Sequence, residues 1–354
     1  MSARRGLVRC AALALIWGTS GGSLAARPTQ PTAPASRWVE RVRGLMGTRF
    51  AIRARIERAE QAEALDRALE RVDALERLWS PWIEGSDLHR INAAGGKPVV
   101  VEPATLALLE RSLALCKASA GAFDPTFFAL HGLWDFRAQP FVPPTDAAIA
   151  ARLPAVGCAG IRLDAAARTV QLLRPGARLH LGANAKGTAL DAAARVLHDA
   201  GLRDYAVDGG GDLVLSGQGP KGPWRVGVQD PGTARGRDIG RLALGAGAVA
   251  TSGDYERSVV HQGRRYHHIL DPRTGRPAMA TRQVTVLVPA GPHAGERADA
   301  LATALFVMGP ERGRRWLAEQ ERGMRPAERT RVFWIAADGR RHASGVLPWV
   351  DGKG

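Results

Sequence analysis

Two hydrophobic periodicities follow each other along this chain in an order that strongly constrains its fold. Apolar and polar residues alternate over 50–56, as in a half-buried strand, and apolar residues recur every three or four positions over 65–79, as in an amphipathic helix. Further helices are predicted over 104–119, 185–201 and 296–308, a hairpin pair of strands over 161–173, and further strands over 205–217, 224–230, 240–253, 266–270, 283–289 and 331–337. Strands and helices are mixed without regular β-α-β alternation, which predicts a single α+β domain.

The N-terminus has the composition of an export signal. Arg4, Arg5 and Arg9 form a positive region without acids, and the apolar run that follows is too short to span a bilayer. Small residues ending at Ala25 or the next alanine provide a cleavage position. The paired arginines also fit a twin-arginine signal, so the export route stays open. We predict a signal peptide over 1–26 and an exported protein, in the periplasm or at the periplasmic face of the inner membrane.

A stretch rich in proline, threonine and alanine over 27–37 is predicted to be a flexible linker, which leaves 38–350 for the folded domain. The formal net charge is +15 and the isoelectric point is about 11.0. The arginines that carry most of this charge are dispersed and interleaved with acids, whereas nucleic-acid-binding proteins cluster theirs. We therefore expect no nucleic-acid partner.

Two cysteines, Cys116 and Cys158, remain after the signal peptide. In an oxidising compartment they could form a disulfide, and buried free thiols are the default expectation. No histidine accompanies them at the spacing of a zinc site.

Two small-residue stretches have the chemistry of a phosphate and metal site. LGANAKGTALD brings Lys186 to the start of a predicted helix, where backbone N–H groups attract anions. ADALATA places Asp299 and Thr303 four residues apart, on one face of a helix. A carboxylate and a hydroxyl suit Mg²⁺ beside a diphosphate. The alternative is a solvated aspartate and a threonine that bonds back to its own helix.

Three other stretches carry weaker signals. The glycines of DGGGDL, over 208–213, mark a tight turn or a close approach of backbone to ligand. The aromatic residues over 121–136 and Trp82 belong to a core or to the wall of a site for a planar ring. His267 and His268 precede the turn DPRTG in a predicted strand, so that one of them faces inward and is a candidate base.

Taken in chain order, these stretches resemble the ApbE family of FAD:protein FMN transferases. The motifs are GLMGTRF, SPWIEGSDLHRIN, GAFDPT, LGANAKGTALD, DGGGDLVLSG, ATSGDY, HHILDPRTGRP and ADALATAL, and they run from about Gly44 to Gly309. The resemblance implies a single ApbE-like, T-fold-related domain of the α+β class, with mixed sheets and flanking helices.

The resemblance also implies an activity. Enzymes of this family bind FAD and Mg²⁺, split the diphosphate, and attach FMN through a phosphoester to a threonine or serine of a target protein, with release of AMP. Many are exported, and their targets include subunits of membrane-bound redox complexes. Export of this chain agrees with that pattern.

Site residues are carried over from the family position by position. The flavin nucleotide is expected at Met46, Trp82, Ala122, Phe123, Asp124, His180, Lys186 and Leu270. The metal is expected at the Ala183 carbonyl, Asp299 and Thr303, and His268 matches the histidine proposed to assist transfer. The segment Thr251, Ser252, Gly253 and Asp254 matches a family loop near the substrate.

The chain departs from the family pattern at His180, where the family has an aspartate, and at Asn184, where it has an apolar residue. A histidine can still donate to an adenine or ribose acceptor, but the carboxylate is lost. Two other functions use the same residues. Attack by water would make the protein an FAD pyrophosphatase, and loss of chemistry would leave a non-catalytic exported FAD-binding protein.

Overall fold

The computed structural model describes residues 36–233 and 236–352. From Ser36 onward the chain forms one compact unit. The predicted signal peptide and most of the predicted linker lie outside the described residues. Arg37, assigned to that linker, is the first residue of strand β1 (Arg37–Leu45) and pairs with Ile56. None of the described helices is both long enough and apolar enough to cross a membrane.

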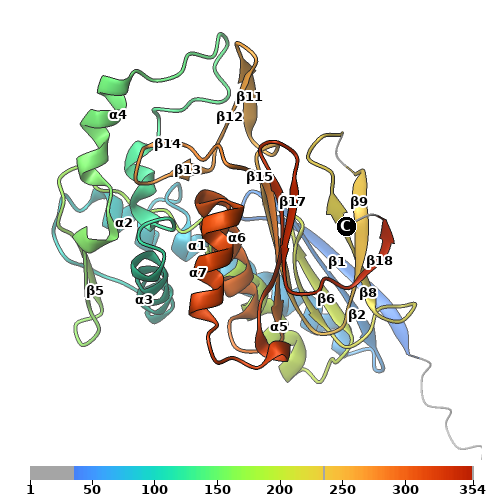
Figure 1. Cartoon of the computed structure of the whole chain (residues 1–354). Coiled ribbons are helices and arrows are strands. Elements are labelled where there is room, and N and C mark those ends of the chain that lie inside the picture. The colour runs from blue at the N-terminus through green and yellow to red at the C-terminus, as the bar shows by residue number, and fades with distance from the viewer. Residues whose placement is uncertain (1–35, 234–235, 353–354) are drawn as a thin grey trace, which may run out of the picture. The chain divides into compact units, whose positions relative to one another are not determined.

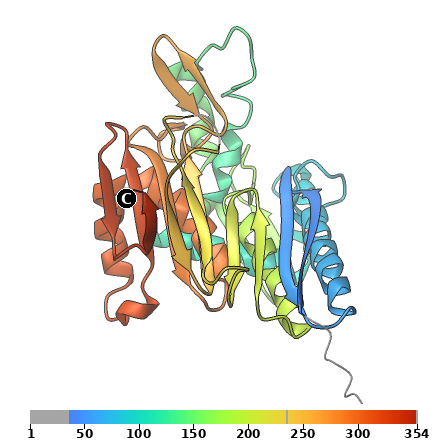
Figure 2. The same cartoon turned by 90° about the vertical axis from the view of Figure 1, so that its right-hand side faces the viewer.

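An eight-stranded sheet forms the centre of the fold (Figures 1 and 2). Its spatial order is β1, β2 (Thr48–Ile56), β6 (Tyr205–Gly209), β7 (Asp212–Ser216), β10 (Gly247–Gly253), β15 (Thr281–Pro289), β16 (Arg331–Ala336) and β17 (Arg341–Ser344). Each neighbouring pair is antiparallel. Short turns therefore connect several neighbours, such as the turn at Met46 and Gly47 between β1 and β2.

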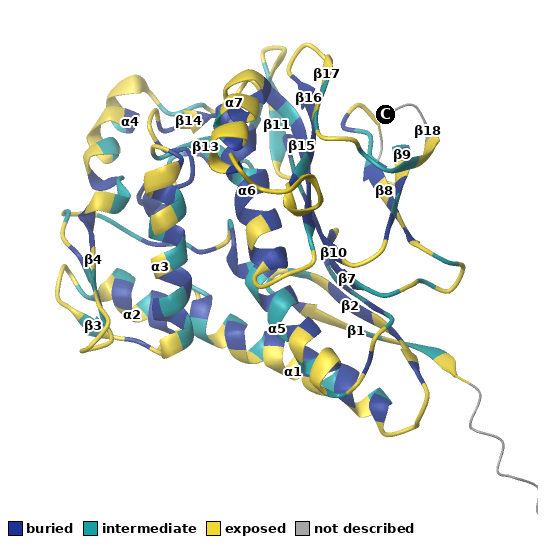
Figure 3. Ribbon diagram, turned by 60° about the horizontal axis from the view of Figure 1, so that its bottom comes forward, coloured by how far each residue is buried: buried dark blue, intermediate teal, exposed yellow. Residues whose placement is uncertain are grey.

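Helices cover one face of this sheet and a second sheet covers the other (Figure 1). The helices are α1 (Gln61–Trp79), α5 (Ala185–Asp199) and α6 (Ala294–Met308), with α7 (Pro310–Gln320) against α6. Buried residues line the strands and the helix faces turned toward them (Figure 3). The second sheet contains β8 (Trp224–Gln229), β9 (Asp238–Leu244) and β18 (Trp349–Gly352). Its Val226 and Leu242 pack with Val249 and Phe333 of the large sheet.

The remaining elements lie beyond the helical layer (Figure 1). They are α2 (Asp87–Ala93), α3 (Pro103–Ala118), α4 (Asp146–Arg152), the sheet β3 (Val99–Val100), β5 (Thr169–Leu172) and β4 (Ile161–Asp164), and the 3-10 helices η1 (Pro125–Leu130), η2 (Leu153–Ala155) and η3 (Cys158–Gly160). The 3-10 helix η4 (Pro326–Glu328) instead contacts β15 of the large sheet. Two small hairpins complete the chain, β11 (Ser258–His261) with β12 (Arg264–His267), and β13 (Leu270–Asp271) with β14 (Arg276–Pro277).

The predicted α+β class is confirmed, but two details of the sequence prediction are wrong. The strand expected over 266–270 is interrupted, because the chain changes partner from β11 to β14 and His268 N bonds to the Arg257 carbonyl at 3.1 Å. The strand over 331–337 does not end the fold, since β17 and β18 follow it. The helices α2, α4 and α7 were not predicted.

Candidate functional site

Lys186 forms a cluster with two buried carboxylates. It lies in the first turn of α5, as the sequence predicts, and its Nζ contacts Asp212 Oδ2. The same nitrogen is 3.6 Å from Asp299 Oδ1 on α6. Asp212 and Asp299 are buried, and the lysine side chain is 26% exposed, so the cation remains open on one side.

The glycine after this lysine lets the two helices meet. A Cβ on Gly187 would lie 2.2 Å from the Gly295 carbonyl oxygen of α6. Gly187 N donates to Asp299 Oδ2 at 2.8 Å, and Asp191 accepts from Gly295 N at 2.8 Å. The close crossing of α5 and α6 therefore fixes the Asp299 carboxylate beside the start of α5.

The predicted metal donors lie on one side of α6. Asp299 and Thr303 are one turn apart on this helix, and Thr303 is half-buried. Ala183 packs with Phe123 against Ala300 and Ala304 of α6. These two alanines directly follow Asp299 and Thr303 in the sequence. A carboxylate, a hydroxyl and a backbone carbonyl are hard oxygen donors, so the donor chemistry fits Mg²⁺.

Asp212 is a site residue that sequence reasoning did not assign. It begins β7, after the glycine turn of DGGGDL, and besides Lys186 it accepts from Thr251 N at 3.0 Å. Asp208, at the other end of that turn, accepts from Gly211 N at 2.8 Å. Burial raises the pKa of Asp208, and the charges of Arg49 and Lys186 oppose this. In the sequence, the two aspartates on either side of three glycines were the signal that could have identified Asp212 as a site residue.

Trp82 lies beside a group of aromatic rings. Its side chain is 64% exposed, and its ring centroid is 5.6 Å from that of Phe128 and 5.1 Å from that of His131. Phe128 also contacts His180 at 5.1 Å, and the Arg178 guanidinium lies 4.7 Å above the Phe128 ring. Trp82, Phe128, His131 and His180 are called here the ring group, and Trp82 and His131 are its exposed members, which offer a surface to a planar ligand.

His180, which replaces the family aspartate, is a neutral donor. Its Nδ1 accepts from Gly182 N at 2.8 Å, which leaves Nε2 to carry the proton. Burial lowers the pKa of His180 to about 4, and the charges of His131 and Arg257 act in the same direction. At neutral pH the side chain therefore offers an N–H where the family offers a carboxylate.

His268 lies just after β12 and is half-buried. Burial lowers its pKa to about 4, the charge of Arg257 adds to this, and a hydrogen bond with the Arg257 backbone opposes it. His267 is the inward-facing neighbour, 2% exposed, with Nε2 3.1 Å from the Ala278 carbonyl. Sequence reasoning missed Arg257, whose charge acts on both His180 and His268.

The segment Thr251 to Asp254 was expected to be a loop, and this is wrong. Its first three residues form the end of β10. The Thr251 hydroxyl lies 3.0 Å from the Thr285 hydroxyl on β15. The Asp254 carboxylate is buried and lies 3.4 Å from Arg282 Nε. Burial raises the pKa of Asp254, and the charges of Arg282 and Arg265 oppose this.

The other residues predicted for the flavin have contacts of their own. Met46 N donates to Glu76 Oε2 at 2.7 Å. Ala122 and Phe123 are buried, and the Asp124 carboxylate accepts hydrogen bonds from Thr126 and Cys158. Leu270 packs against the apolar groups that contain Leu130 and Trp134. The structure therefore brings Lys186 and Asp299 together, with Thr303 one turn further along α6, and places Met46 and Leu270 in separate contacts.

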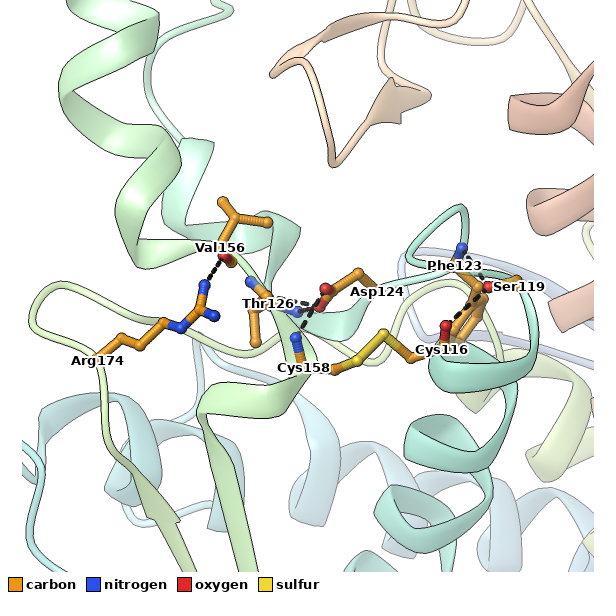
Figure 4. The surroundings of a disulfide bond; sticks show 9 residues. Cys116, Ser119, Phe123, Asp124, Thr126, Val156, Cys158 and Arg174 are labelled. Atoms are coloured by element: carbon orange, nitrogen blue, oxygen red, sulfur yellow. Dashed lines mark hydrogen bonds between the residues drawn. A yellow bond between two sulfur atoms is a disulfide. The ribbon is translucent and has the colours of Figure 1, made fainter.

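Cys116 and Cys158 are joined by a disulfide, so the expectation of free thiols is wrong (Figure 4). Their sulfur atoms lie close to the Asp124 carboxylate. A disulfide has no thiolate to offer a metal, so this group is not a metal site.

Comparisons with known proteins show the family of this chain. The family model for the ApbE family matches residues 46–325. An FAD:protein FMN transferase of Rhodobacter capsulatus is 37% identical over 67% of this chain, and the match spans 45% of that protein. The enzymes of that name from Vibrio cholerae and Treponema pallidum are 35% and 34% identical over 70% and 76% of this chain, and 73% and 78% of their own lengths.

Solved structures give the same result. The crystal structure of the ApbE protein of Thermotoga maritima superposes with a TM-score of 0.77 at 31% identity, over 87% of this chain and 97% of that one. The flavin transferase ApbE of Vibrio cholerae gives 0.73 at 31% identity, with the same coverage. On its sequence motifs, its fold and these matches, the chain belongs to the ApbE family.

Proposed function

We propose that this protein transfers FMN from FAD to a threonine or serine of an acceptor protein and releases AMP. The observation that carries the proposal is the cluster of Lys186, Asp212 and Asp299, with Thr303 one turn further along α6. Such a group fits a diphosphate and a divalent cation, and relatives matched over most of this chain are named FAD:protein FMN transferase.

The protein's own residues divide the work of binding. Lys186 provides the positive charge for the diphosphate, and the ring group provides a surface for a flat ring of FAD. Asp299, Thr303 and the Ala183 carbonyl would hold Mg²⁺. When bound, the cation neutralises phosphate charge and orients the diphosphate.

We assign the role of the base to His268. The hydroxyl oxygen of the acceptor attacks the FMN phosphorus, a new P–O bond forms, and the bond from that phosphorus to the bridging oxygen breaks. The bridging oxygen leaves with AMP, and the hydroxyl proton passes to the imidazole. A neutral histidine is required for this step, and burial keeps His268 neutral at pH 7.

The cell compartment and the acceptor are part of the proposal. The export signal composition of residues 1–26 supports action in the periplasm or at the periplasmic face of the inner membrane. An acceptor there with a threonine or serine on a membrane redox complex fits this location. Fractionation of cells that express the full chain tests the proposed location, and an enzyme found only in the cytoplasm would contradict it.

The activity is tested with purified protein, FAD, and either Mg²⁺ or EDTA, with and without an acceptor domain. We expect Mg²⁺-dependent AMP release and flavin fluorescence on the denatured acceptor. Asp299→Asn keeps an acceptor for Gly187 N but removes the charge, and should lower the rate at least 100-fold. The matched control is Asp204→Asn, which changes a carboxylate paired with Arg55.

Two other outcomes would contradict the transfer. AMP without a labelled acceptor would point to the FAD pyrophosphatase. Bound FAD without AMP under all conditions would point to a carrier. Undiminished transfer by His268→Ala would remove that residue from the mechanism.

A further inference from the structure

A disulfide joins two elements on either side of the 122–126 segment (Figure 4). Cys116 belongs to the last turn of α3, and Cys158 begins η3, 42 residues later. Cys116 is 1% exposed and Cys158 is half-buried. The residues between them include Ala122, Phe123 and Asp124, which are predicted to bind the flavin nucleotide.

The first half-cystine holds the start of this segment. The Cys116 carbonyl accepts from Gly121 N at 2.9 Å and from Ser119 Oγ at 3.2 Å. The same serine oxygen accepts from Phe123 N at 3.1 Å. The backbone of Phe123 is therefore tied to the helix end that carries Cys116.

The second half-cystine holds the end of the segment. Cys158 N donates to Asp124 Oδ2 at 2.9 Å, and Gly157 N donates to Thr126 Oγ1 at 2.7 Å. Asp124 Oδ1 accepts from the N and Oγ1 of Thr126 at 2.8 and 2.6 Å. Both carboxylate oxygens are used inside the protein, so Asp124 acts as a positioning residue.

Arg174 stabilises the loop that carries Cys158. Its guanidinium donates to the Val156 carbonyl, and a Cβ on Gly157 would lie 2.3 Å from Arg174 Nη1. A Cβ on Gly160 would lie 2.7 Å from the same side chain. The loop therefore has a cation packed against its backbone and a disulfide at its centre.

The segment also packs against α6, the helix that carries Asp299 and Thr303. The Phe123 ring is 2% exposed and packs against Ala300 and Ala304 of α6 and against Ala183. Movement of Phe123 would thus change the surface that meets the diphosphate site. Residues held in their bound geometry before the ligand arrives bind it with a smaller loss of conformational entropy.

We propose that the Cys116–Cys158 disulfide, together with Asp124, positions the 122–126 segment for FAD, so that breaking the bond weakens FAD binding and leaves the transfer step intact. This inference rests on the proposed function. Reduction adds two electrons and two protons, and gives two thiols. A dithiol such as dithiothreitol supplies both as it closes to its own cyclic disulfide.

The test compares oxidised enzyme, enzyme reduced with dithiothreitol, and the double variant Cys116→Ser/Cys158→Ser. FAD binding is measured by flavin fluorescence with EDTA present, and KM and kcat for AMP release with Mg²⁺. We expect Kd and KM for FAD to rise at least fivefold after reduction, while kcat at saturating FAD changes less than twofold. Asp124→Asn should raise KM with the disulfide intact, and the control Asp204→Asn should not.

Thiol titration and circular dichroism accompany each measurement. Unchanged Kd in enzyme with two titratable thiols would overturn the proposal. A fall in kcat with unchanged KM would also overturn it, as would global unfolding of both reduced forms, since the bond would then act on the whole fold. Absence of FAD binding by the oxidised enzyme would instead contradict the proposed function itself.

Discussion

At the scale of single residues, the environment of His268 decides how it can work. Burial and the Arg257 charge lower its pKa to about 4, so nearly all of the imidazole is unprotonated at pH 7. A base is most effective when its pKa lies near the working pH, so this histidine gives up basicity in return for always being in the reactive form. Asp212 differs from His268, because its carboxylate is paired with the Lys186 cation and serves binding.

The acid limb of the rate profile follows from this pKa. Protonation of His268 removes the base, so we expect kcat for transfer to stay level from pH 7 to about pH 5 and to fall below that. A histidine with an ordinary pKa would give a fall near pH 6.5. Rates are measured at saturating FAD and acceptor.

Arg257→Gln is the matched variant for this profile. It removes a positive charge that lowers the pKa of His268, so the acid limb should move to higher pH. An identical profile in wild type and variant would show that another group controls the limb. A fall centred near pH 6.5 in wild type would contradict the assignment of a buried, neutral His268.

At the scale of elements, periodicity predicted the long helices and the strands with clear alternation. Helices α1 and α5 were predicted because each buries one apolar face, and α6 because it is apolar and buried over nearly all of its length. Helix α7 was missed because it is mostly polar and buries few residues. The break between β12 and β13 was missed because a change of strand partner leaves no mark in local composition.

In the candidate site, too, the sequence predicted the residues that lie in distinctive local motifs and missed those that depend on distant contacts. The motifs located Lys186, Asp299, Thr303 and His268, since each lies in a short stretch with its own chemistry. Arg257 and the disulfide could not be predicted, because both depend on segments far apart in the sequence. Cysteine spacing alone does not say whether two thiols come within bonding distance.

The crossing of α5 and α6 gives a prediction at this scale. In Gly187→Ala the new Cβ would lie 2.2 Å from a backbone oxygen of Gly295, which cannot move as a side chain can. We expect a loss of about 1–3 kcal/mol in the free energy of unfolding, as for overpacked cores. Separation of the helices would also move Asp299 from Lys186 and lower kcat/KM for FAD.

Gly44→Ala is the control, because a Cβ there has nothing within 4 Å. Both variants are compared by urea unfolding and by AMP release. Equal stability of Gly187→Ala and Gly44→Ala would show that the crossing tolerates a methyl group. Loss of stability without loss of kcat/KM would show that the crossing of α5 and α6 is not needed to position the site residues.

At the scale of the whole molecule, the residues assigned to the site come from loops, strands and helices spread over the chain from Met46 to Thr303. The packing on the two faces of the large sheet holds these segments, so stability and activity depend on the same packing. Among the described residues, burial lowers the pKa of three histidines, His180, His267 and His268, to about 4.

Acid should therefore destabilise the protein well above the pKa of these groups. A histidine with a folded pKa near 4 and an unfolded pKa near 6.5 stabilises the fold fully above pH 6.5, and its contribution is lost as the pH falls toward 4. For His267, which is 2% exposed, this amounts to roughly 3 kcal/mol over that window. Buried aspartates with raised pKa values, such as Asp191, act in the opposite sense, so the comparison needs a variant.

His267→Gln is the variant needed for this comparison, because glutamine can donate to the Ala278 carbonyl and does not titrate. We expect the variant to lose less stability than wild type between pH 7 and pH 4.5, measured by urea unfolding at each pH. His198→Gln changes an exposed histidine and should follow the wild-type slope. Equal slopes in all three proteins would mean that the pKa of His267 is the same in the folded and unfolded states, which would contradict the prediction.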